Sequence, residues 1–249
     1  MSEFLFNYER AFNPLITGHL ESASFDLMLN QQQAKQIHRF LALEKGMNIL
    51  DIPCGTGRHA KLLAEQGFEI DALDYNAAFI EQAHQYAKDA GLSVNFMQGD
   101  MRELRFKEKY DRIFNVFSSF GYFDDKTNLK VMQEMSSALK PGGRLLLNVL
   151  NGESAAVKAC ENGIVRQFKD LNSHYDPVSK ILTTNRALKI EGDEYSYEFK
   201  VRLYSASELT NMLEMCGLVP LEWFGDWSGS ALTSTSAQIF VIAEKSLAA

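Results

Sequence analysis

Short apolar segments alternate with segments of helical period from residue 47 onward, and this alternation limits the folds open to the chain. The apolar segments predict strands at 48–52, 68–73, 94–97, 112–117 and 144–150. The amphipathic segments between most of them have the 3.6-residue period of helices. Strands separated by helices predict right-handed crossovers, a parallel sheet and helices on both of its faces.

A different period governs the chain after about residue 160. Residues 195–203 alternate strictly, with Tyr197 and Val201 on one side and Lys200 and Arg202 on the other. A period of two indicates antiparallel strands with one covered face. We therefore expect a small antiparallel sheet over residues 164–204, inserted into the α/β layer.

The remaining sequence completes one α/β domain of 249 residues. A capping box, Ser205-x-x-Glu208, predicts the start of a helix, and two late strands are expected near 218–224 and 237–244. With the first five, these make a mostly parallel seven-stranded sheet. The predicted divisions are a helical N-terminal cap at 1–45, a core at 46–150, the insert at 164–204, and a C-terminal helix with strands at 205–249.

Charge and composition exclude several classes of function. The formal net charge is −7 and no run of Lys or Arg occurs, so nucleic acid is not an expected partner. No apolar run approaches the roughly 18 residues needed to cross a membrane, and the N-terminus does not resemble a signal peptide. The three cysteines are far apart and lack metal-site spacing. We expect a cytoplasmic protein, with monomer and homodimer both open.

A glycine-containing loop follows the first predicted strand. Gly55-x-Gly57-x-x-Ala60 lies between a strand and a helix, and Asp74 ends the second strand 19 residues after Gly55. The glycines allow a ligand to approach the backbone, and a carboxylate at Asp74 suits the two hydroxyl groups of a ribose. The pattern predicts a nucleoside-binding site.

Asp51, directly before this loop, narrows the choice of nucleoside. A fixed carboxylate would repel the pyrophosphate of a dinucleotide, whereas it would attract the ammonium and sulfonium groups of S-adenosylmethionine (SAM). SAM is therefore the expected cofactor. An NAD-dependent oxidoreductase remains an alternative.

These residues carry a resemblance to a known family. The segment at 51–59 fits the pattern D-x-x-C-G-x-G-R-H and is similar to the first motif of class I SAM-dependent methyltransferases that act on small molecules. The resemblance continues, in order, through residues 72–76, 99–101, 115–123 and 139–143. It implies a Rossmann-like fold, SAM as methyl donor, S-adenosylhomocysteine (SAH) as product, and no metal.

The resemblance also implies roles for individual residues. The methionine end of SAM would be held by Asp51, Gly55, Thr56, Gly57 and Arg58, the ribose by Asp74, the adenine by Tyr75, Asp100 and Met101, and the sulfonium end by Asn115 and Phe117. Methyl transfer is an in-line displacement, so the protein mainly positions the acceptor and excludes water. We expect the acceptor to be an N or O atom of a small molecule. A SAM-binding protein without catalysis is the alternative from another class.

The acceptor side is less well marked in the sequence. Candidate pocket residues are Tyr8, Tyr122, Phe123, His174 and Arg202, and no His–Asp pair identifies a catalytic base. The insert is expected to cover the active site, with a helix at residues 3–30 closing the other side and Arg202 near an anionic substrate group. An interface between two copies of the chain is the alternative for the insert.

Overall fold

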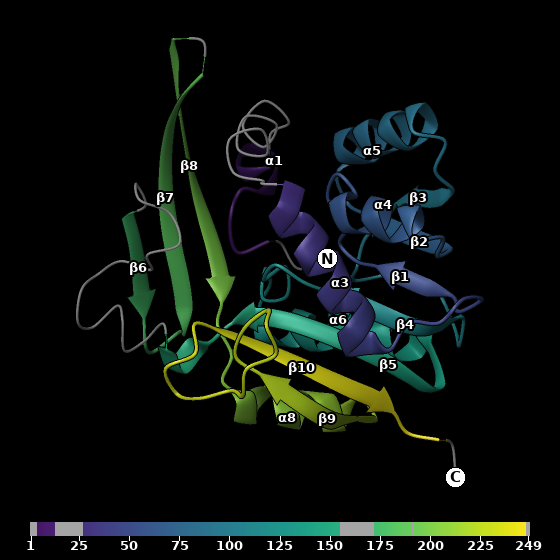
Figure 1. Cartoon of the computed structure of the whole chain (residues 1–249). Coiled ribbons are helices and arrows are strands. Elements are labelled where there is room, and N and C mark those ends of the chain that lie inside the picture. The colour runs from purple at the N-terminus through teal and green to yellow at the C-terminus, as the bar shows by residue number, and fades with distance from the viewer. Residues whose placement is uncertain (1–3, 13–26, 155–171, 191, 248–249) are drawn as a thin grey trace.

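The structure is a computed structural model that describes residues 4–12, 27–154, 172–190 and 192–247. Residues 1–3 and 13–26 of the expected N-terminal cap, and 164–171 and 191 of the expected insert, lie outside these ranges. The described residues form a seven-stranded sheet, a separate three-stranded sheet and helices around them (Figure 1).

The large sheet has the strand order β3-β2-β1-β4-β5-β10-β9. Its strands are β3 (Val94–Gln98), β2 (Ile70–Asp74), β1 (Ile49–Asp51), β4 (Tyr110–Asn115), β5 (Leu139–Leu150), β10 (Gln238–Lys245) and β9 (Leu218–Phe224). The strands from β3 to β5 are parallel, and β10 runs antiparallel to both β5 and β9. The predicted fold class is confirmed. The largest difference in boundary is at β5, which begins at Leu139 and includes the Pro-Gly-Gly segment, whereas the sequence predicts a strand over 144–150.

Helices cover both faces of this sheet. On one face lie α3 (Leu27–Leu41), α4 (Arg58–Glu65) and α5 (Ala77–Asp89), and on the other lie α6 (Asp125–Ala138) and α8 (Ala206–Met215). Each face has its own apolar core, one containing Leu63 and Ile80, the other Met132 and Leu213. The amphipathic period of the sequence thus places each helix against the sheet.

Side-chain caps begin α5 and α8, and the sequence predicts the one at α8. The Asn76 side chain accepts hydrogen bonds from the backbone N–H groups of Ala78 and Phe79 at the start of α5. Ser205 and Glu208 form the predicted capping box at the start of α8, each side chain accepting from the other's backbone N–H. These bonds satisfy N–H groups that have no partner inside the helix.

The three-stranded antiparallel sheet consists of β6 (Asn172–Asp176), β7 (Ile181–Ile190) and β8 (Asp193–Arg202). Along β8, Tyr197 and Val201 are buried as the alternation predicts. The β7–β8 hairpin stands beside α1 (Tyr8–Ala11), at the edge of the molecule away from α5 (Figure 1). Arg10 of α1 joins the two, because its Nε donates to the Ser196 carbonyl at 2.6 Å.

A single helix over residues 3–30 is not what the structure contains. Helix α1 has only four residues, and Phe12 ends it. Residues 4–7 are not helical: the Leu5 N–H donates to the Tyr122 carbonyl at 2.9 Å, and the Asn7 side chain caps α1 by accepting from Arg10 N–H. The preference of this segment for helix is overridden by tertiary contacts of its aromatic side chains.

Candidate active site

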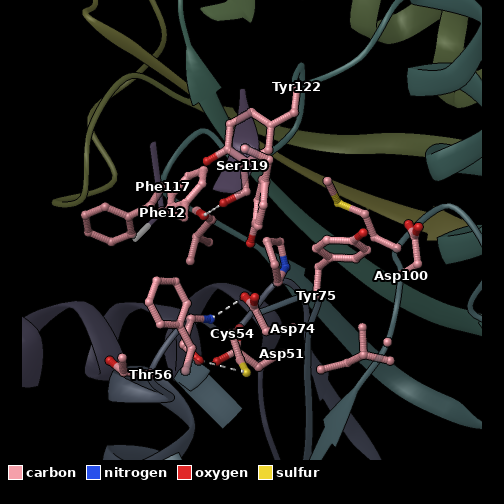
Figure 2. A pocket seen from close by; sticks show the side chains of 18 of the residues that line it. Phe12, Asp51, Cys54, Thr56, Asp74, Tyr75, Asp100, Phe117, Ser119 and Tyr122 are labelled. Atoms are coloured by element: carbon pink, nitrogen blue, oxygen red, sulfur yellow. Dashed lines mark hydrogen bonds between the residues drawn. The ribbon is translucent and has the colours of Figure 1, made fainter. Parts of the chain in front are cut away.

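A cavity of about 330 Å³ lies at the carboxyl ends of β1, β2 and β4. In an open α/β sheet this is where the strand order reverses, and ligands bind at such switch points. Nine of the residues predicted to bind the cofactor line it: Asp51, Gly55, Thr56, Arg58, Asp74, Tyr75, Asp100, Met101 and Phe117. Figure 2 shows Asp51 and Asp74 together at one side of this cavity and Ser119 and Tyr122 across from them.

Asp51 ends β1 and is almost completely buried. Its carboxylate accepts a hydrogen bond from the backbone N–H of Ala60, but its Oδ2 has no hydrogen-bond partner among the described residues. Burial raises the pKa of Asp51 well above its usual value, and the nearby Arg58 opposes that shift. A buried carboxylate oxygen without a donor is costly, so this geometry favours a cationic ligand that supplies one.

The Asp74 carboxylate ends β2 and already accepts several hydrogen bonds. Its Oδ2 accepts from Gly55 N–H at 2.7 Å and its Oδ1 from Asn76 N–H at 2.9 Å. The hydroxyl of Tyr8 also donates to this carboxylate. Burial raises the pKa of Asp74 against the effect of these donors. Asp74 thereby joins the glycine loop, the start of α5 and the N-terminal segment.

Asp100 follows β3 and forms a two-pronged ion pair with Arg102. The Arg102 Nε lies 2.9 and 3.0 Å from the two carboxylate oxygens, and Nη2 lies 2.6 Å from Oδ2. Burial alone would raise the pKa of Asp100, but Arg102 outweighs it and holds the pKa below its usual value. Asp100 is therefore an ionised acceptor fixed in orientation at the cavity wall, beyond Tyr75 from Asp74 in Figure 2.

Phe117 is held in the loop after β4 by Asn148 of β5. Phe117 and Ser118 both have left-handed backbone, with φ of 66° and 58°. The Asn148 side-chain oxygen accepts from Phe117 N–H, and its carbonyl accepts from Ser118 N–H. The guanidinium of Arg58 lies 3.7 Å from the centre of the Phe117 ring. These contacts fix an aromatic ring and a cation at one end of the cavity.

His59 also lines the cavity, next to the Phe117 ring. It is buried, stacks on Phe117 with ring centres 5.4 Å apart, and shares a hydrogen bond with Gln33 at 3.1 Å. Burial lowers the pKa of His59 well below its usual value, and Arg58 lowers it further. The imidazole is consequently neutral near physiological pH.

Aromatic side chains form the rest of the wall. They come from the N-terminal segment, the loop after β4 and the start of α5: Phe4, Tyr8, Phe12, Phe79, Tyr122 and Phe123. Phe4 contacts both Tyr8 and Phe123, with ring centres 4.5 and 4.7 Å apart. The predicted pocket residues Tyr8, Tyr122 and Phe123 are thus brought to the cavity. Burial raises the pKa of Tyr122 far above its usual value, so its phenol is neutral.

Two residues predicted to bind the cofactor do not line the cavity. Gly57 has a φ of 76°, and a Cβ there would lie 2.4 Å from the Phe96 ring, so close packing under the loop requires glycine. Asn115 ends β4 with no exposed surface, and neither atom of its amide has a hydrogen-bond partner in the described part of the chain.

The predicted positions of His174 and Arg202 require correction. His174 is exposed on β6 opposite Thr183 and does not line the cavity. Arg202 is 9% exposed, but its guanidinium contacts Asp125 at 3.0 Å and Glu208 at 2.7 Å outside the cavity. At the end of β8 this arginine anchors the hairpin to the core instead of facing the expected substrate.

Arg186 of β7 lines the cavity and was missed by sequence reasoning. Leu182 and Thr184 are buried, and a period of two places Arg186 on their side of the strand. A charged residue that continues a covered face is the signal that could have identified it.

The described residues lack two kinds of feature, a membrane-spanning helix and a metal-binding cluster. No helix in them combines the length and apolar character needed to cross a bilayer. They also hold no group of three or more His, Cys, Asp or Glu side chains arranged to bind a metal ion.

Comparison with known proteins identifies the domain. Residues 49–143 match the family model described as a methyltransferase domain. The YqeM protein of Bacillus subtilis is 26% identical over 217 residues, covering 82% of this chain and 85% of that protein. The ubiquinone/menaquinone biosynthesis C-methyltransferase UbiE of Bordetella parapertussis is 28% identical over 229 residues, covering 86% and 82%.

Solved structures share the fold. A SAM-dependent methyltransferase from Clostridium acetobutylicum superposes with a TM-score of 0.76 at 17% identity, covering 95% of this chain and 99% of that one. The matched domain and the relatives confirm the prediction that this chain is a SAM-dependent methyltransferase, and the solved structure shows that it has the expected fold.

Proposed function

We propose that this enzyme transfers the methyl group of SAM to an N or O atom of a small molecule that contains a ring. The observation that carries the proposal is the aromatic wall of Phe4, Tyr8, Phe12 and Tyr122, which continues from the carboxylates at the strand ends. A cavity of this size and lining suits a planar molecule of low molecular weight.

The residues at the strand ends fit SAM. The unpartnered Oδ2 of Asp51 would accept from its ammonium group. Gly55 has a φ of 55°, and a Cβ there would meet nothing within 4 Å, so the loop leaves room on the cavity side. Arg58 would bind the carboxylate of the methionine end, with Thr56 and Gly57 shaping the loop around it.

We infer the other roles from the family resemblance and from the side chains that line the cavity. Asp74 would accept from the ribose hydroxyls, Tyr75 would lie against the adenine, and Asp100 would accept from its amino group beside the Met101 backbone. Phe117 would border the sulfonium end. When bound, SAM supplies an electrophilic methyl group on a positively charged sulfur. The chain itself orients the acceptor and keeps water out.

The ionisable groups on the wall favour an acceptor that needs little activation. Burial keeps His59 and Tyr122 neutral, and Asp74 is occupied by its own donors. A neutral amine attacks without a base, and an acidic hydroxyl can lose its proton before binding. Segment 4–12 and the three-stranded sheet would close the cavity from water.

A ring carbon is the second candidate acceptor atom. The similarity to UbiE, which is described as a C-methyltransferase of ubiquinone and menaquinone biosynthesis, favours it. An electron-rich aromatic ring placed against the same wall would present a carbon or an oxygen to the methyl group.

Binding and turnover measurements test the proposal in sequence. Calorimetry with SAM, SAH and NAD should show binding of the two sulfur nucleosides and little binding of NAD. Incubation with methyl-labelled SAM and a library of aromatic amines, phenols and quinols should then give SAH and a methylated product. Nuclear magnetic resonance of that product would distinguish N-, O- and C-methyl groups.

Each possible failure has a distinct meaning. Tighter binding of NAD than of SAH would contradict the cofactor assignment. SAM binding without turnover on any acceptor class would favour a SAM-binding protein without catalysis. A C-methylated product would replace the N or O atom by the second candidate.

A further inference from the structure

Arg186 brings a cation to the cavity from the three-stranded sheet. It lies on β7 opposite Tyr197 of β8, and its Nη1 donates to the Tyr197 hydroxyl at 3.1 Å. Among the described lining residues, the other arginine is Arg58, which lies at the cofactor loop over Phe117. The two arginines therefore reach the cavity from different elements, the start of α4 and β7.

A second, more open hollow adjoins the first at this residue. Its volume is about 350 Å³, and its lining includes Arg10, Arg186, Asn7 and Asn185. Arg186 lines both spaces, so it marks the place where the aromatic cavity meets a polar surface. A molecule with its ring against the aromatic wall and a polar group toward the hollow would pass Arg186.

The charges around Arg186 favour an anion at that point. Glu198 is the acid that lines the hollow, and its Oε1 lies 2.7 Å from Lys200, which offsets its charge. Arg10 is fixed beside the hollow by its bonds to the Ser196 carbonyl and hydroxyl, at 2.6 and 3.3 Å. Two guanidinium groups with neutral amides and one paired acid form a surface suited to a carboxylate or a phosphate ester.

We propose that Arg186 binds an anionic substituent of the methyl acceptor, so that the preferred substrates are ring compounds carrying a carboxylate or phosphate. This inference rests on the proposed function, because it assigns the acceptor to the aromatic cavity. Arg186 would select the substrate and set its orientation, with the ring against Tyr122 and the anionic group at the boundary of the two spaces.

Matched pairs of small aromatic probes test this proposal on the full chain loaded with SAH. The probes are 3-hydroxybenzoate, 4-aminobenzoate and 4-hydroxyphenylacetate, each compared with its primary amide by calorimetry at low ionic strength. The wild-type protein should bind at least one carboxylate about 10-fold or more tightly than its amide, the size expected for a charge-assisted hydrogen bond.

Substitutions of Arg186 test whether this residue causes the preference for carboxylate over amide. Arg186→Gln keeps a donor for the Tyr197 hydroxyl and should remove the preference for carboxylate, while Arg186→Lys should keep part of it. Lys189→Ala, on the same strand with a 74% exposed side chain, is the matched control and should leave the preference unchanged. SAH affinity should stay within about twofold in all variants, because Arg186 belongs to β7 and not to the loop proposed to bind the cofactor.

Two results would overturn the inference. One is equal binding or no binding of every carboxylate and amide pair by the SAH-loaded wild-type protein. The other is a carboxylate preference that persists in Arg186→Gln. If the wild-type protein does not bind SAH at all, the proposed function itself is contradicted. Failure of the proposed function is therefore distinguishable from failure of the inference about Arg186.

Discussion

The Tyr8 hydroxyl occupies an acceptor position on Asp74 that the proposed ribose contact would need. A carboxylate has about four acceptor positions, and the N–H groups of Gly55, Asn76 and Tyr75 and the Tyr8 hydroxyl already donate to Asp74. Two ribose hydroxyls would therefore have to displace donors already on Asp74, such as the Tyr8 hydroxyl. Tyr8→Phe keeps the ring in the aromatic wall but removes the competing donor. We therefore expect Tyr8→Phe to tighten SAH binding by about twofold to tenfold, measured by calorimetry.

Tyr86→Phe provides the matched control for this prediction. Tyr86 is a half-exposed tyrosine on α5 and does not line the cavity. Its substitution should leave SAH affinity unchanged. Weaker SAH binding by Tyr8→Phe would mean that the hydroxyl contacts the ligand directly instead of competing with it.

The sequence predicts which side chains stand at the strand ends, because a strand's last residue is visible in its apolar pattern. It cannot predict their partners across the fold. Asp100 was expected at the adenine, but the pattern gives no sign that Arg102 holds it on both oxygens. Arg202 was assigned to a substrate and lies in ion pairs, while Arg186 lines the cavity. Both outcomes depend on the register of β7 with β8.

At the scale of secondary-structure elements, Gly121 joins the loop after β4 to the end of β8. Its carbonyl accepts from Arg202 N–H at 2.8 Å, its φ is 111°, and a Cβ there would lie 2.4 Å from the Arg202 carbonyl oxygen. The added methyl group in Gly121→Ala would push the hairpin away from the core or break this hydrogen bond. We expect a loss of more than about 2 kcal/mol in the free energy of unfolding, from strain plus displaced backbone.

The control for this joint is Gly192→Ala, in the turn between β7 and β8. Gly192 has a similar φ of 99°, but a Cβ there would meet nothing within 4 Å. Gly192→Ala should lower the free energy of unfolding only by the cost of the backbone conformation, about 1–2 kcal/mol. Urea unfolding of both variants measures the difference. Equal losses would show that the contact with Arg202 imposes no extra cost.

The elements that the sequence predicts well are those whose stability is local or periodic. Helix α8 begins at its capping box, and β8 keeps its alternation. The prediction of a helix over residues 3–30 is wrong because the aromatic side chains of this segment pack against distant partners, as Phe6 does against Tyr122 and Phe199. Those partners are known only from the folded structure. Segment 4–12 belongs to the cavity wall for that reason.

On the scale of the whole molecule, a charged network attaches the three-stranded sheet to the core. Glu208 of α8 accepts from Lys180 and Arg202 at 2.7 Å each, and Arg202 also contacts Asp125 of α6. The order of strands and helices follows from the apolar pattern of the sequence. This attachment joins residues far apart in the chain, and only the folded arrangement reveals it.

The same network makes stability depend on pH in a defined window. Burial alone would raise the pKa of Glu208, but hydrogen bonds from Lys180, Ser205 and Arg202 outweigh it and lower the pKa from 4.5 to about 2. A carboxyl group with a lowered pKa stabilises the fold above its unfolded-state pKa, and the contribution disappears as the pH falls toward the folded-state value.

Glu208→Gln should therefore lower the free energy of unfolding by about 1–3 kcal/mol near neutral pH. The gap to the wild-type protein should narrow as the pH falls from about 4.5 toward 2. Urea unfolding at a series of pH values measures the gap, with Glu214→Gln on the exposed side of α8 as the control that should change little. A gap that stays constant across this window would show that the ionised Glu208 does not hold the sheet to the core.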